Sequence, residues 1–436
     1  MEGEMDILEY DRTHVWHPYA SLKNPPPVRL AKGASGVKID VEGKGPLIDA
    51  VSSWWCAAHG HNHPRLVEAL RRQSERLCHV MFGGFTHAPA VELAQRLADM
   101  CPDGLDRVFF ADSGSIAVEV AVKMATQYQY AKGLRSRTKM LSLKGGYHGD
   151  TACAMALSDP DGMHTLFAGM MPRHFFADKP EIPFGGEWNE RALESVERAV
   201  AEHGGEIAGI ICEPVFQAAN AMNFYHPAFL KGLRRICSEN GLLLVFDEIA
   251  AGFYRTGPRW AAGHAGVVPD IMTVGKALTG GHITLAATIA SGEVAETISS
   301  GEPGAFMHGP TYMANPLACA VAIESLKLFA ESDYGSKVRH IEGEFRRHLA
   351  GFGGGNVKSV RILGAAAVIE VDRMPARADI ERIIDGHGVW LRPFSNYIYS
   401  MPPLISSDGD IDAIAGAMKS LALCEPGPVL PGDFHE

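Results

Sequence analysis

The sequence has no long apolar run, a deficit of basic residues and no closely paired cysteines. No stretch of the 436 residues approaches the roughly 18 uncharged apolar residues of a membrane helix. Lysine and arginine (40) are outnumbered by aspartate and glutamate (51), and the net charge of −11 disfavours nucleic acid as a partner. The acidic start, Met1–Asp6, lacks the basic and apolar regions of a signal peptide. We therefore expect a cytoplasmic protein that binds neither membranes nor nucleic acid.

The eight cysteines are scattered, and none forms a C-x-x-C pair. This spacing is typical of reduced, mostly buried thiols and not of a disulfide framework or a zinc knuckle. The alternating histidines of His59–His63 invite a metal interpretation, but Gly60, Asn62 and Pro64 indicate a turn into a helix, and no cysteine or carboxylate completes a ligand set. We expect no metal site.

The length and the order of the predicted elements indicate an α/β protein with more than one core. From Pro89 onwards, strand and helix patterns alternate, which predicts a mostly parallel sheet with right-handed crossovers. Near Leu326 the pattern changes to that of a smaller α+β unit. We expect an N-terminal arm that also forms part of the small domain (1–60), a large domain (61–325), a C-terminal small domain (326–422) and a loose tail (423–436).

Two apolar segments are each followed by a charged residue. Leu242–Phe246 is a continuous apolar run, as in a strand covered on both faces, and Asp247 follows it. Ile271–Val274 is a second short apolar run, followed by Gly275 and Lys276. Ligands bind at the carboxyl ends of strands in open α/β sheets. Asp247 and Lys276 are therefore expected to meet at one edge of the sheet.

This pair fits two kinds of chemistry. A partly desolvated lysine can react as a neutral amine, and an aspartate can keep the pyridine nitrogen of pyridoxal phosphate protonated. An apolar strand ending in Asp-Glu also resembles the metal-binding strand of a nucleotide hydrolase, which additionally requires G-x-x-x-x-G-K-[ST]. Lys276 has Asp270 at the first glycine position and Ala277 in place of Ser or Thr, and no other Gly-Lys has the spacing. The hydrolase hypothesis is therefore disfavoured.

Three further segments place chemical groups at predicted strand ends. Asp112–Ser115 opens a helix, where it could bind an anion or could provide only an ordinary serine cap. Tyr147 lies in the glycine-rich turn Lys144–Asp150, from which an aromatic ring can lie against a cofactor. Glu213 follows the apolar run Ile207–Cys212. Earlier in the chain, two adjacent tryptophans in Ser52–Trp55 predict one buried ring and one at a wet boundary.

Motifs over residues 11–422 resemble the class III aminotransferases of fold type I. The Lys276 segment and Asp247 are similar to features shared by the whole class. Other segments resemble, more narrowly, the subfamily that acts in biotin biosynthesis: Trp16–Tyr19, Ser52–Trp55, His79–Gly84, Phe306–Thr311 and Arg392–Phe394.

The resemblance implies a fold type I pyridoxal-phosphate-dependent transferase fold, with pyridoxal 5'-phosphate as the cofactor. Lys276 would hold the cofactor covalently and move the substrate proton, and Asp247 would pair with the pyridinium nitrogen. Tyr147 would cover one face of the ring. The resemblance places the phosphate site at Gly114, Ser115, Pro310 and Thr311. Because Thr311 would come from a second subunit, the active sites would lie at the interface of a homodimer.

The resemblance also implies the substrates and the residues that line their cavity. Arg392 would take the carboxylate of 8-amino-7-oxononanoate, since a guanidinium binds a planar carboxylate through two hydrogen bonds. The amino donor would be S-adenosylmethionine, with Tyr19 counted among the catalytic residues. Asp150 and Glu213 are lesser candidates. The full set of expected substrate-binding residues is Tyr19, Trp54, Tyr147, Lys276, Gly309, Arg392 and Tyr399.

Some positions depart from the subfamily pattern. Ala218-Ala219-Asn220-Ala221 stands where relatives have a glycine-rich run, Ala251 replaces a frequent threonine, and His282-Ile283 follows the Gly280-Gly281 pair. These differences leave two alternatives open: lysine as the amino donor, or another ω-amino acid or diamine as the substrate. A non-catalytic relative is disfavoured because Lys276 and Asp247 are both present.

Overall fold

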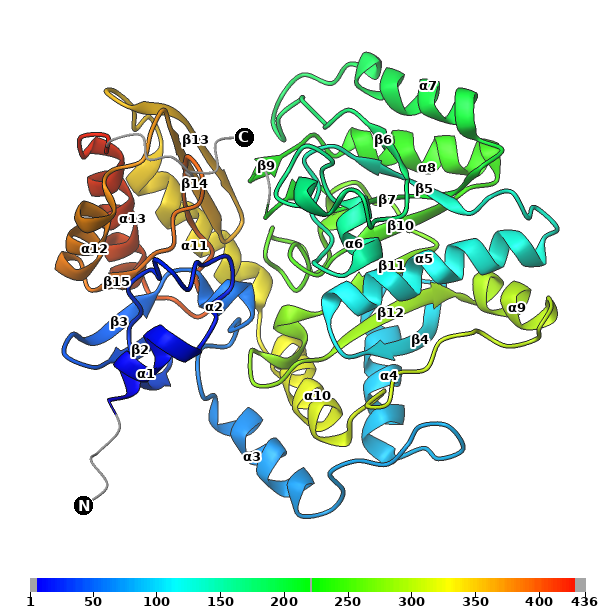
Figure 1. Cartoon of the computed structure of the whole chain (residues 1–436), viewed down its shortest axis with the longest axis horizontal. Coiled ribbons are helices and arrows are strands. Elements are labelled where there is room, and N and C mark those ends of the chain that lie inside the picture. The colour runs from blue at the N-terminus through cyan, green and yellow to red at the C-terminus, as the bar shows by residue number, and fades with distance from the viewer. Residues whose placement is uncertain (1–5, 220–221, 428–436) are drawn as a thin grey trace.

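The computed structural model describes residues 6–219 and 222–427, and its largest element is a seven-stranded sheet (Figure 1). The strand order is β4-β12-β11-β10-β7-β5-β6. The expected strands are confirmed to within two residues at either end, and the short edge strand β6 adds to them. The bounds are β4 Leu105–Ala111, β5 Lys139–Leu143, β6 Phe175–Ala177, β7 Ile207–Cys212, β10 Leu243–Asp247, β11 Ile271–Val274 and β12 Ala286–Ser291.

The sheet is mostly parallel, as expected. Strand β10 pairs in parallel with β7 and β11, and β5 pairs in parallel with β7 and β6. Strand β12 is the exception, since it runs antiparallel to both β11 and β4. Every residue of β7 and β10 is buried, which explains why both read as continuous apolar runs in the sequence.

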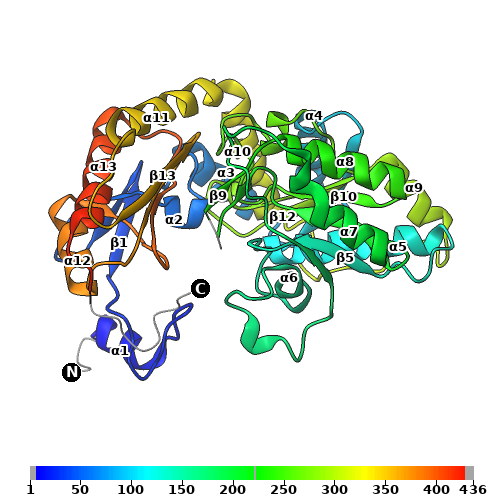
Figure 2. The same cartoon turned by 90° about the horizontal axis from the view of Figure 1, so that it is seen from above.

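Helices cover both faces of this sheet (Figure 2). Val245 of β10 packs with α5 (Gly114–Ala131) and α9 (Gly292–Ser300), whereas Phe246 packs on the opposite face with α7 (Glu194–His203) and α8 (Ala228–Asn240). Alternate residues of one strand thus enter two different cores, because side chains alternate across a strand. The short helix α6 (Ala152–Leu157) follows β5 on the α5 side.

Two smaller sheets lie to one side of the large sheet (Figure 1). The first has the order β1-β2-β3-β15, and its last strand pairs in parallel with β3, so that the beginning and the end of the chain share one sheet. The second has the order β13-β14-β16. Their bounds are β1 Ala31–Ser35, β2 Lys38–Val41, β3 Gly45–Asp49, β13 Val357–Leu363, β14 Ala366–Val371, β15 Val389–Trp390 and β16 Tyr397–Ser400.

One expected strand is in fact a hairpin. The apolar pattern over Val360–Val371, interrupted by glycine, predicts one strand, but the structure divides it into antiparallel β13 and β14, which turn at Gly364. This glycine has φ +56°, and a Cβ there would lie 2.5 Å from the carbonyl oxygen of Arg255. The backbone conformation and the close approach both require glycine, so the interruption marks a reversal of the chain.

The remaining elements complete the two regions. The helices around the small sheets are α11, α12 and α13, while α3 and α4 pack against α10 below the large sheet (Figure 1). We propose the domain division expected from the sequence, with its second boundary inside α10. The bounds are α1 Ile7–His14, α2 Ser52–Trp55, α3 Pro64–Ser74, α4 Ala88–Met100, α10 Pro316–Glu331, α11 Tyr334–Leu349, α12 Arg377–Gly386, α13 Asp408–Leu423, β8 Phe216–Gln217 and β9 Asn223–Phe224.

Several expectations concern the chain outside these elements. All eight cysteines are free thiols. No helix in the described part of the chain is long and apolar enough to cross a membrane. Ala218 and Ala219 follow β8, whereas Asn220 and Ala221 lie outside the described residues, as do the last nine residues of the expected tail.

Candidate active site

Asp247 and Lys276 lie at neighbouring strand ends, as expected. Asp247 is the last residue of β10 and pairs in register with Thr273 of β11. Lys276 comes two residues after β11 and begins the 3-10 helix η4 (Lys276–Thr279) with a positive φ of 46°. The Lys276 Nζ lies 5.0 Å from the centroid of the Trp55 ring.

Asp247 forms a buried ion pair with His148, a residue that the sequence reasoning did not single out. The Nδ1 of His148 lies 2.7 Å from Oδ2 of Asp247, while the Ile249 N–H and the Thr273 hydroxyl donate to Oδ1. Burial lowers the pKa of His148, but the hydrogen bond with Asp247 and the charge of that carboxylate outweigh it and raise the pKa overall. These three contacts fix both carboxylate oxygens of Asp247.

Glu213 fixes the backbone that carries Tyr147. Its Oε2 accepts a hydrogen bond from the Tyr147 N–H at 3.0 Å, and its Oε1 accepts one from the Ala218 N–H at 3.0 Å. Complete burial raises the pKa of Glu213 to about 7. Glu213 therefore has a structural contact to the expected ring-facing residue, in addition to its position at the strand end.

Tyr19, Tyr147 and Asp150 converge although Tyr19 comes from the N-terminal arm. The Tyr19 hydroxyl donates to Oδ2 of Asp150 at 3.0 Å. Burial, followed by the charge of Asp150, raises the pKa of Tyr19. Burial also raises the pKa of Tyr147 well above its usual range, with Tyr19 and Asp150 as its polar neighbours. His164, which the sequence reasoning did not single out, completes this group through contacts with Asp150 and Tyr147.

The two tryptophans of Ser52–Trp55 lie on a left-handed turn. All four residues have positive φ values between 40° and 72°. L-residues pay about 1–2 kcal/mol each for this conformation, and such strain is concentrated at functional sites. The Ser53 hydroxyl donates to Asp49 at 2.7 Å, which helps to hold the turn. Trp55 is buried and Trp54 is 41% exposed, so the prediction of one buried ring and one ring at the boundary with solvent is confirmed.

Arg392 lies beside the exposed tryptophan. Its guanidinium carbon is 5.1 Å from the centroid of the Trp54 ring. Burial raises the pKa of Tyr399 to about 12, and the charge of Arg392 opposes this rise, as it also does at Tyr19. Among the described residues, no carboxylate forms an ion pair with Arg392. Tyr19, Trp54 and Tyr399 thus all lie near Arg392.

The expected phosphate site lies at the N-terminus of α5. The Ser113 hydroxyl caps this helix, and the Ser115 hydroxyl accepts a hydrogen bond from the Asp150 N–H at 3.2 Å. A Cβ at Gly114 would lie 3.0 Å from the Ile249 side chain, and a Cβ at Gly149 would lie 2.0 Å from Ser115 Oγ. Close backbone approach and the unpaired N–H groups of a helix start are suited to an anion.

These groups fit pyridoxal phosphate. The donor set contains one amine, one buried carboxylate at a strand end, one helix N-terminus and one aromatic ring in a glycine-rich turn. Gly114 and Gly149 let the backbone lie close against the side chains of Ile249 and Ser115, where any other residue would place a Cβ.

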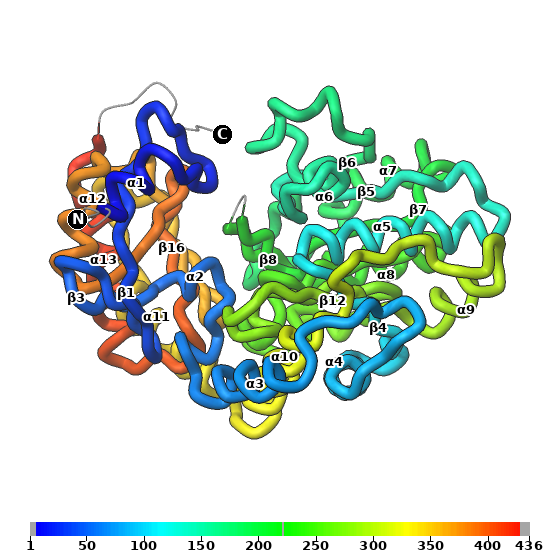
Figure 3. Tube along the Cα trace, turned by 60° about the horizontal axis from the view of Figure 1, so that its bottom comes forward, coloured from blue at the N-terminus to red at the C-terminus, as the bar shows by residue number. Residues whose placement is uncertain are grey.

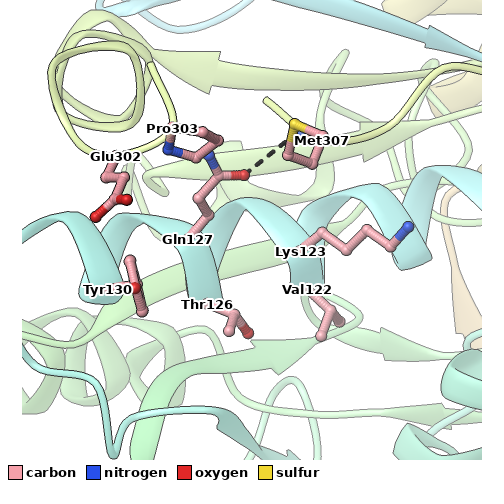
Figure 4. Close-up of a pocket in the computed structure, with 8 residues that line it drawn as sticks. All are labelled: Val122, Lys123, Thr126, Gln127, Tyr130, Glu302, Pro303 and Met307. Atoms are coloured by element: carbon pink, nitrogen blue, oxygen red, sulfur yellow. Dashed lines mark hydrogen bonds between the residues drawn. The ribbon is translucent and has the colours of Figure 1, made fainter. Parts of the chain in front are cut away.

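Gly309, Pro310 and Thr311 are not brought to the rest of the site within one chain. Gly309 and Thr311 are exposed, in the loop between α9 and α10. This loop packs against the middle of α5, where Gln127 bonds to the Ala305 carbonyl and the Met307 N–H. Figure 4 shows the cavity of about 510 Å³ beside these contacts, and its lining includes none of the expected site residues.

The alternating histidines have separate partners. His59 bonds to the hydroxyls of Tyr334 (2.6 Å) and Ser325 (2.9 Å). His61 pairs with Asp49 at 2.9 Å, and His63 accepts a hydrogen bond from the first turn of α3. This arrangement supports structural roles for all three.

Comparison with known proteins agrees with this geometry. The family model "Aminotransferase class-III" matches residues 19–422. A Mycobacterium leprae protein named adenosylmethionine-8-amino-7-oxononanoate aminotransferase is 45% identical and covers 94% of this chain and 95% of its own. A protein of the same name from Buchnera aphidicola of Acyrthosiphon pisum is 44% identical, with 94% and 96% coverage.

Solved structures show the same fold. The crystal structure of an enzyme of that name from Methanocaldococcus jannaschii matches with a TM-score of 0.88 and 29% identity, covering 95% of this chain and 99% of that one. An omega transaminase from Pseudomonas jessenii in complex with PMP matches with a TM-score of 0.87 and 25% identity, covering 96% and 98%. The chain therefore belongs to the class-III aminotransferase family and is an aminotransferase whose cofactor is pyridoxal phosphate.

Proposed function

We propose that this protein transfers the amino group of S-adenosylmethionine to 8-amino-7-oxononanoate, a step in biotin biosynthesis. The names and the nearly complete coverage of its relatives support this proposal. The observation that carries it is the position of Arg392, a cation without a carboxylate partner among the described residues, over the exposed ring of Trp54. Such a guanidinium is suited to the carboxylate of the oxononanoate.

Four sets of residues would hold the cofactor. When bound, pyridoxal phosphate supplies an aldehyde that accepts the amino group and a ring that withdraws electrons from the bond being broken. Lys276 would bind it covalently, Asp247 would accept a hydrogen bond from the pyridine N–H, and the N-terminus of α5 at Gly114 and Ser115 would bind the phosphate. Tyr147 would cover one ring face, on a backbone held by Glu213.

Lys276 would also move the substrate proton. Once the substrate amine has displaced Lys276, its Nζ would be a free amine, able to take the proton from the substrate Cα and give it to C4′ of the cofactor. Trp55 limits the positions of this side chain, since the Nζ lies 5.0 Å from the ring centroid. His148 holds Oδ2 of Asp247 by a hydrogen bond, and both residues are buried away from solvent.

The substrate cavity would bind its ligands from two sides. Arg392 and Trp54 would hold the carboxylate end and the adjacent methylene chain of the oxononanoate. Tyr19 and Tyr147 would line the opposite side, near Asp150. Tyr399 is 2% exposed, and its ring packs edge-on against Trp55 with 6.3 Å between the ring centroids. Tyr399 would therefore hold Trp55 in place.

We also propose a homodimer in which a second copy completes the phosphate site. Gly309 and Thr311 are exposed in the single chain. In a dimer, the loop of the partner would supply Gly309, Pro310 and Thr311 to this site. The acidic composition and the substrates are consistent with a cytoplasmic enzyme.

A panel of amino donors tests the proposed function. Purified protein loaded with pyridoxal phosphate is mixed in turn with S-adenosylmethionine, lysine and common amino acids, and the absorbance of the bound cofactor is followed. We expect S-adenosylmethionine alone to bleach it, and the amino group then to pass to 8-amino-7-oxononanoate. Bleaching by lysine alone would assign a different donor, and failure of the oxononanoate to restore the absorbance would contradict the proposed acceptor.

A further inference from the structure

Asp150 is held by three separate segments of the chain. Its Oδ2 accepts from the Tyr19 hydroxyl at 3.0 Å, and its Oδ1 lies 2.9 Å from the Nε2 of His164. Its N–H donates to the Ser115 hydroxyl at 3.2 Å. The N-terminal arm, the start of α5 and the segment after α6 therefore meet at Asp150.

His164 is a buried residue in a largely exposed segment. Its side chain is 6% exposed, whereas Leu166 and Met170 of the same segment are 87% and 64% exposed. This segment, between α6 and β6, projects to the same side of the molecule as α1 and the N-terminal arm (Figures 2 and 3). The imidazole also stacks on Tyr147, with 5.9 Å between ring centroids and an angle of 27°. The His164 side chain is thus buried against Asp150 and Tyr147 while its neighbours remain in solvent.

The contact with Asp150 has a defined direction. An ionised carboxylate only accepts hydrogen bonds, so the Nε2 of His164 must carry the hydrogen and donate it. This hydrogen bond is the main cause that lowers the pKa of Asp150, and it outweighs the opposing effect of burial. His164 therefore keeps Asp150 charged and fixes one of its two oxygens.

The exposed part of Asp150 is available to a ligand. The side chain is 54% exposed, and its hydrogen bonds with Tyr19, His164 and Tyr147 leave room for another because a carboxylate has about four acceptor positions. Arg392 lies close enough for its charge to act on Tyr19, which is bonded to Asp150. One anionic group, Asp150, and one cationic group, Arg392, therefore both lie near Tyr19.

We propose that His164 is a positioning residue that fixes the charged Asp150 for recognition of a cationic amino donor. This inference rests on the proposed function, whose donor carries both an ammonium and a sulfonium group. Both substrates carry an ammonium and a carboxylate, but the sulfonium gives the donor one more positive charge than the acceptor, so the carboxylate of Asp150 attracts the donor more strongly. His164 acts through Asp150 and makes no contact of its own with the reacting atoms.

Two substitutions separate the hydrogen bond from the stacking contact. His164→Gln keeps an N–H donor near the position of Nε2 but removes the ring, whereas His164→Phe keeps a ring on Tyr147 but removes the donor. Each is made in a Lys276→Ala background loaded with pyridoxal phosphate, which cannot turn over. Isothermal titration calorimetry then measures the dissociation constant of S-adenosylmethionine. We expect His164→Phe to raise it about tenfold, as for one charge-assisted hydrogen bond, and His164→Gln to change it less than about twofold.

The outcomes distinguish this inference from the proposed function. If the Lys276→Ala parent does not bind S-adenosylmethionine, the proposed donor is wrong. If the parent binds and His164→Phe binds equally well, or if both variants weaken binding equally, the positioning role is overturned.

In the active enzyme, His164→Phe should also move the acid limb of the kcat/KM profile for the donor to higher pH, because the pKa of Asp150 rises. An unshifted profile would contradict the inference.

Discussion

The Nζ of Lys276 lies 5.0 Å from the centroid of the Trp55 ring, which stands on a left-handed turn. The ring faces the amine and limits its positions, and the turn is strained in the absence of any glycine. We predict that Trp55→Leu slows the first half-reaction by roughly tenfold, because the smaller side chain no longer limits the positions of the reacting amine. Single-turnover measurements with S-adenosylmethionine check this, with Trp55→Phe as a control that retains an aromatic face. Equal rates for Trp55→Leu and the parent would contradict a positioning role for Trp55.

Lys276→Ala should abolish both turnover and covalent capture of the cofactor. Lys276 is the lysine at the strand end beside Asp247, and loss of its amine removes the base as well as the attachment point. Borohydride reduction followed by peptide mass spectrometry measures the capture. Lys144→Ala, which removes an exposed lysine 3.2 Å from Asp178, serves as the control and should retain the adduct. An adduct on any other lysine in Lys276→Ala would show that the assignment is wrong.

Gly149→Ala should destabilise the protein and weaken cofactor retention. Gly149 has φ +124°, and an added Cβ would lie 2.0 Å from Ser115 Oγ at the start of α5. Overpacking of this kind costs about 1–3 kcal/mol, and the shift of Ser115 would disturb the anion site. Thermal unfolding and dialysis of the loaded protein measure the two effects. Gly169→Ala is the matched control because nothing lies within 4 Å of its Cβ position. Equal behaviour of the two variants would argue against the close packing of Gly149 and Ser115.

The charge of Glu213 gives a prediction on pH. Burial raises its pKa to about 7, against about 4.3 in an unfolded chain. Folding thus favours the neutral form, so this contribution to stability is full below about pH 4.3 and is lost as the pH rises through about 7. The amide of the Glu213→Gln variant cannot ionise. We therefore expect the Tm of this variant without cofactor, relative to that of the parent, to increase between about pH 5 and about pH 8. A difference that does not change with pH would show that Glu213 is not ionising in this range.

The fold could be predicted where burial alone determines the pattern. The apolar runs Ile207–Cys212 and Ile271–Val274 agree with β7 and β11 residue for residue, since strands covered on both faces are apolar throughout. The reversed direction of β12 has no local signal. The hairpin at Gly364 was missed because an apolar pattern with one glycine fits either a strand or a turn. The pairing of β15 with β3 joins distant parts of the chain and depends on tertiary contacts.

The candidate site shows the same limit. Asp247 and Lys276 could be placed because each follows a recognisable strand. His148 lies in the glycine-rich loop but has no signal of its own, since its partner Asp247 is 99 residues away in sequence. His164 has even less signal, because it lies in a segment of exposed residues. The role expected of Thr311 needs a second subunit, so neither the sequence nor a single chain can test it.

Arg392→Lys should weaken binding of 8-amino-7-oxononanoate much more than binding of the donor. A lysine keeps the positive charge but cannot form two parallel hydrogen bonds to a carboxylate, and it fits the Trp54 face less well. Arg392→Ala also removes the charge and should raise the acceptor KM further. Each charge-assisted hydrogen bond contributes about 1.5–3 kcal/mol, so we expect a rise of roughly tenfold or more for the lysine variant. Steady-state kinetics with each substrate varied in turn measures this. Because Arg392 lies 5.1 Å from the ring centroid of Trp54, Trp54→Leu should show a smaller effect on the same constant, and the double variant should be less than additive. An unchanged acceptor KM in Arg392→Lys and Arg392→Ala would place the carboxylate elsewhere in the cavity.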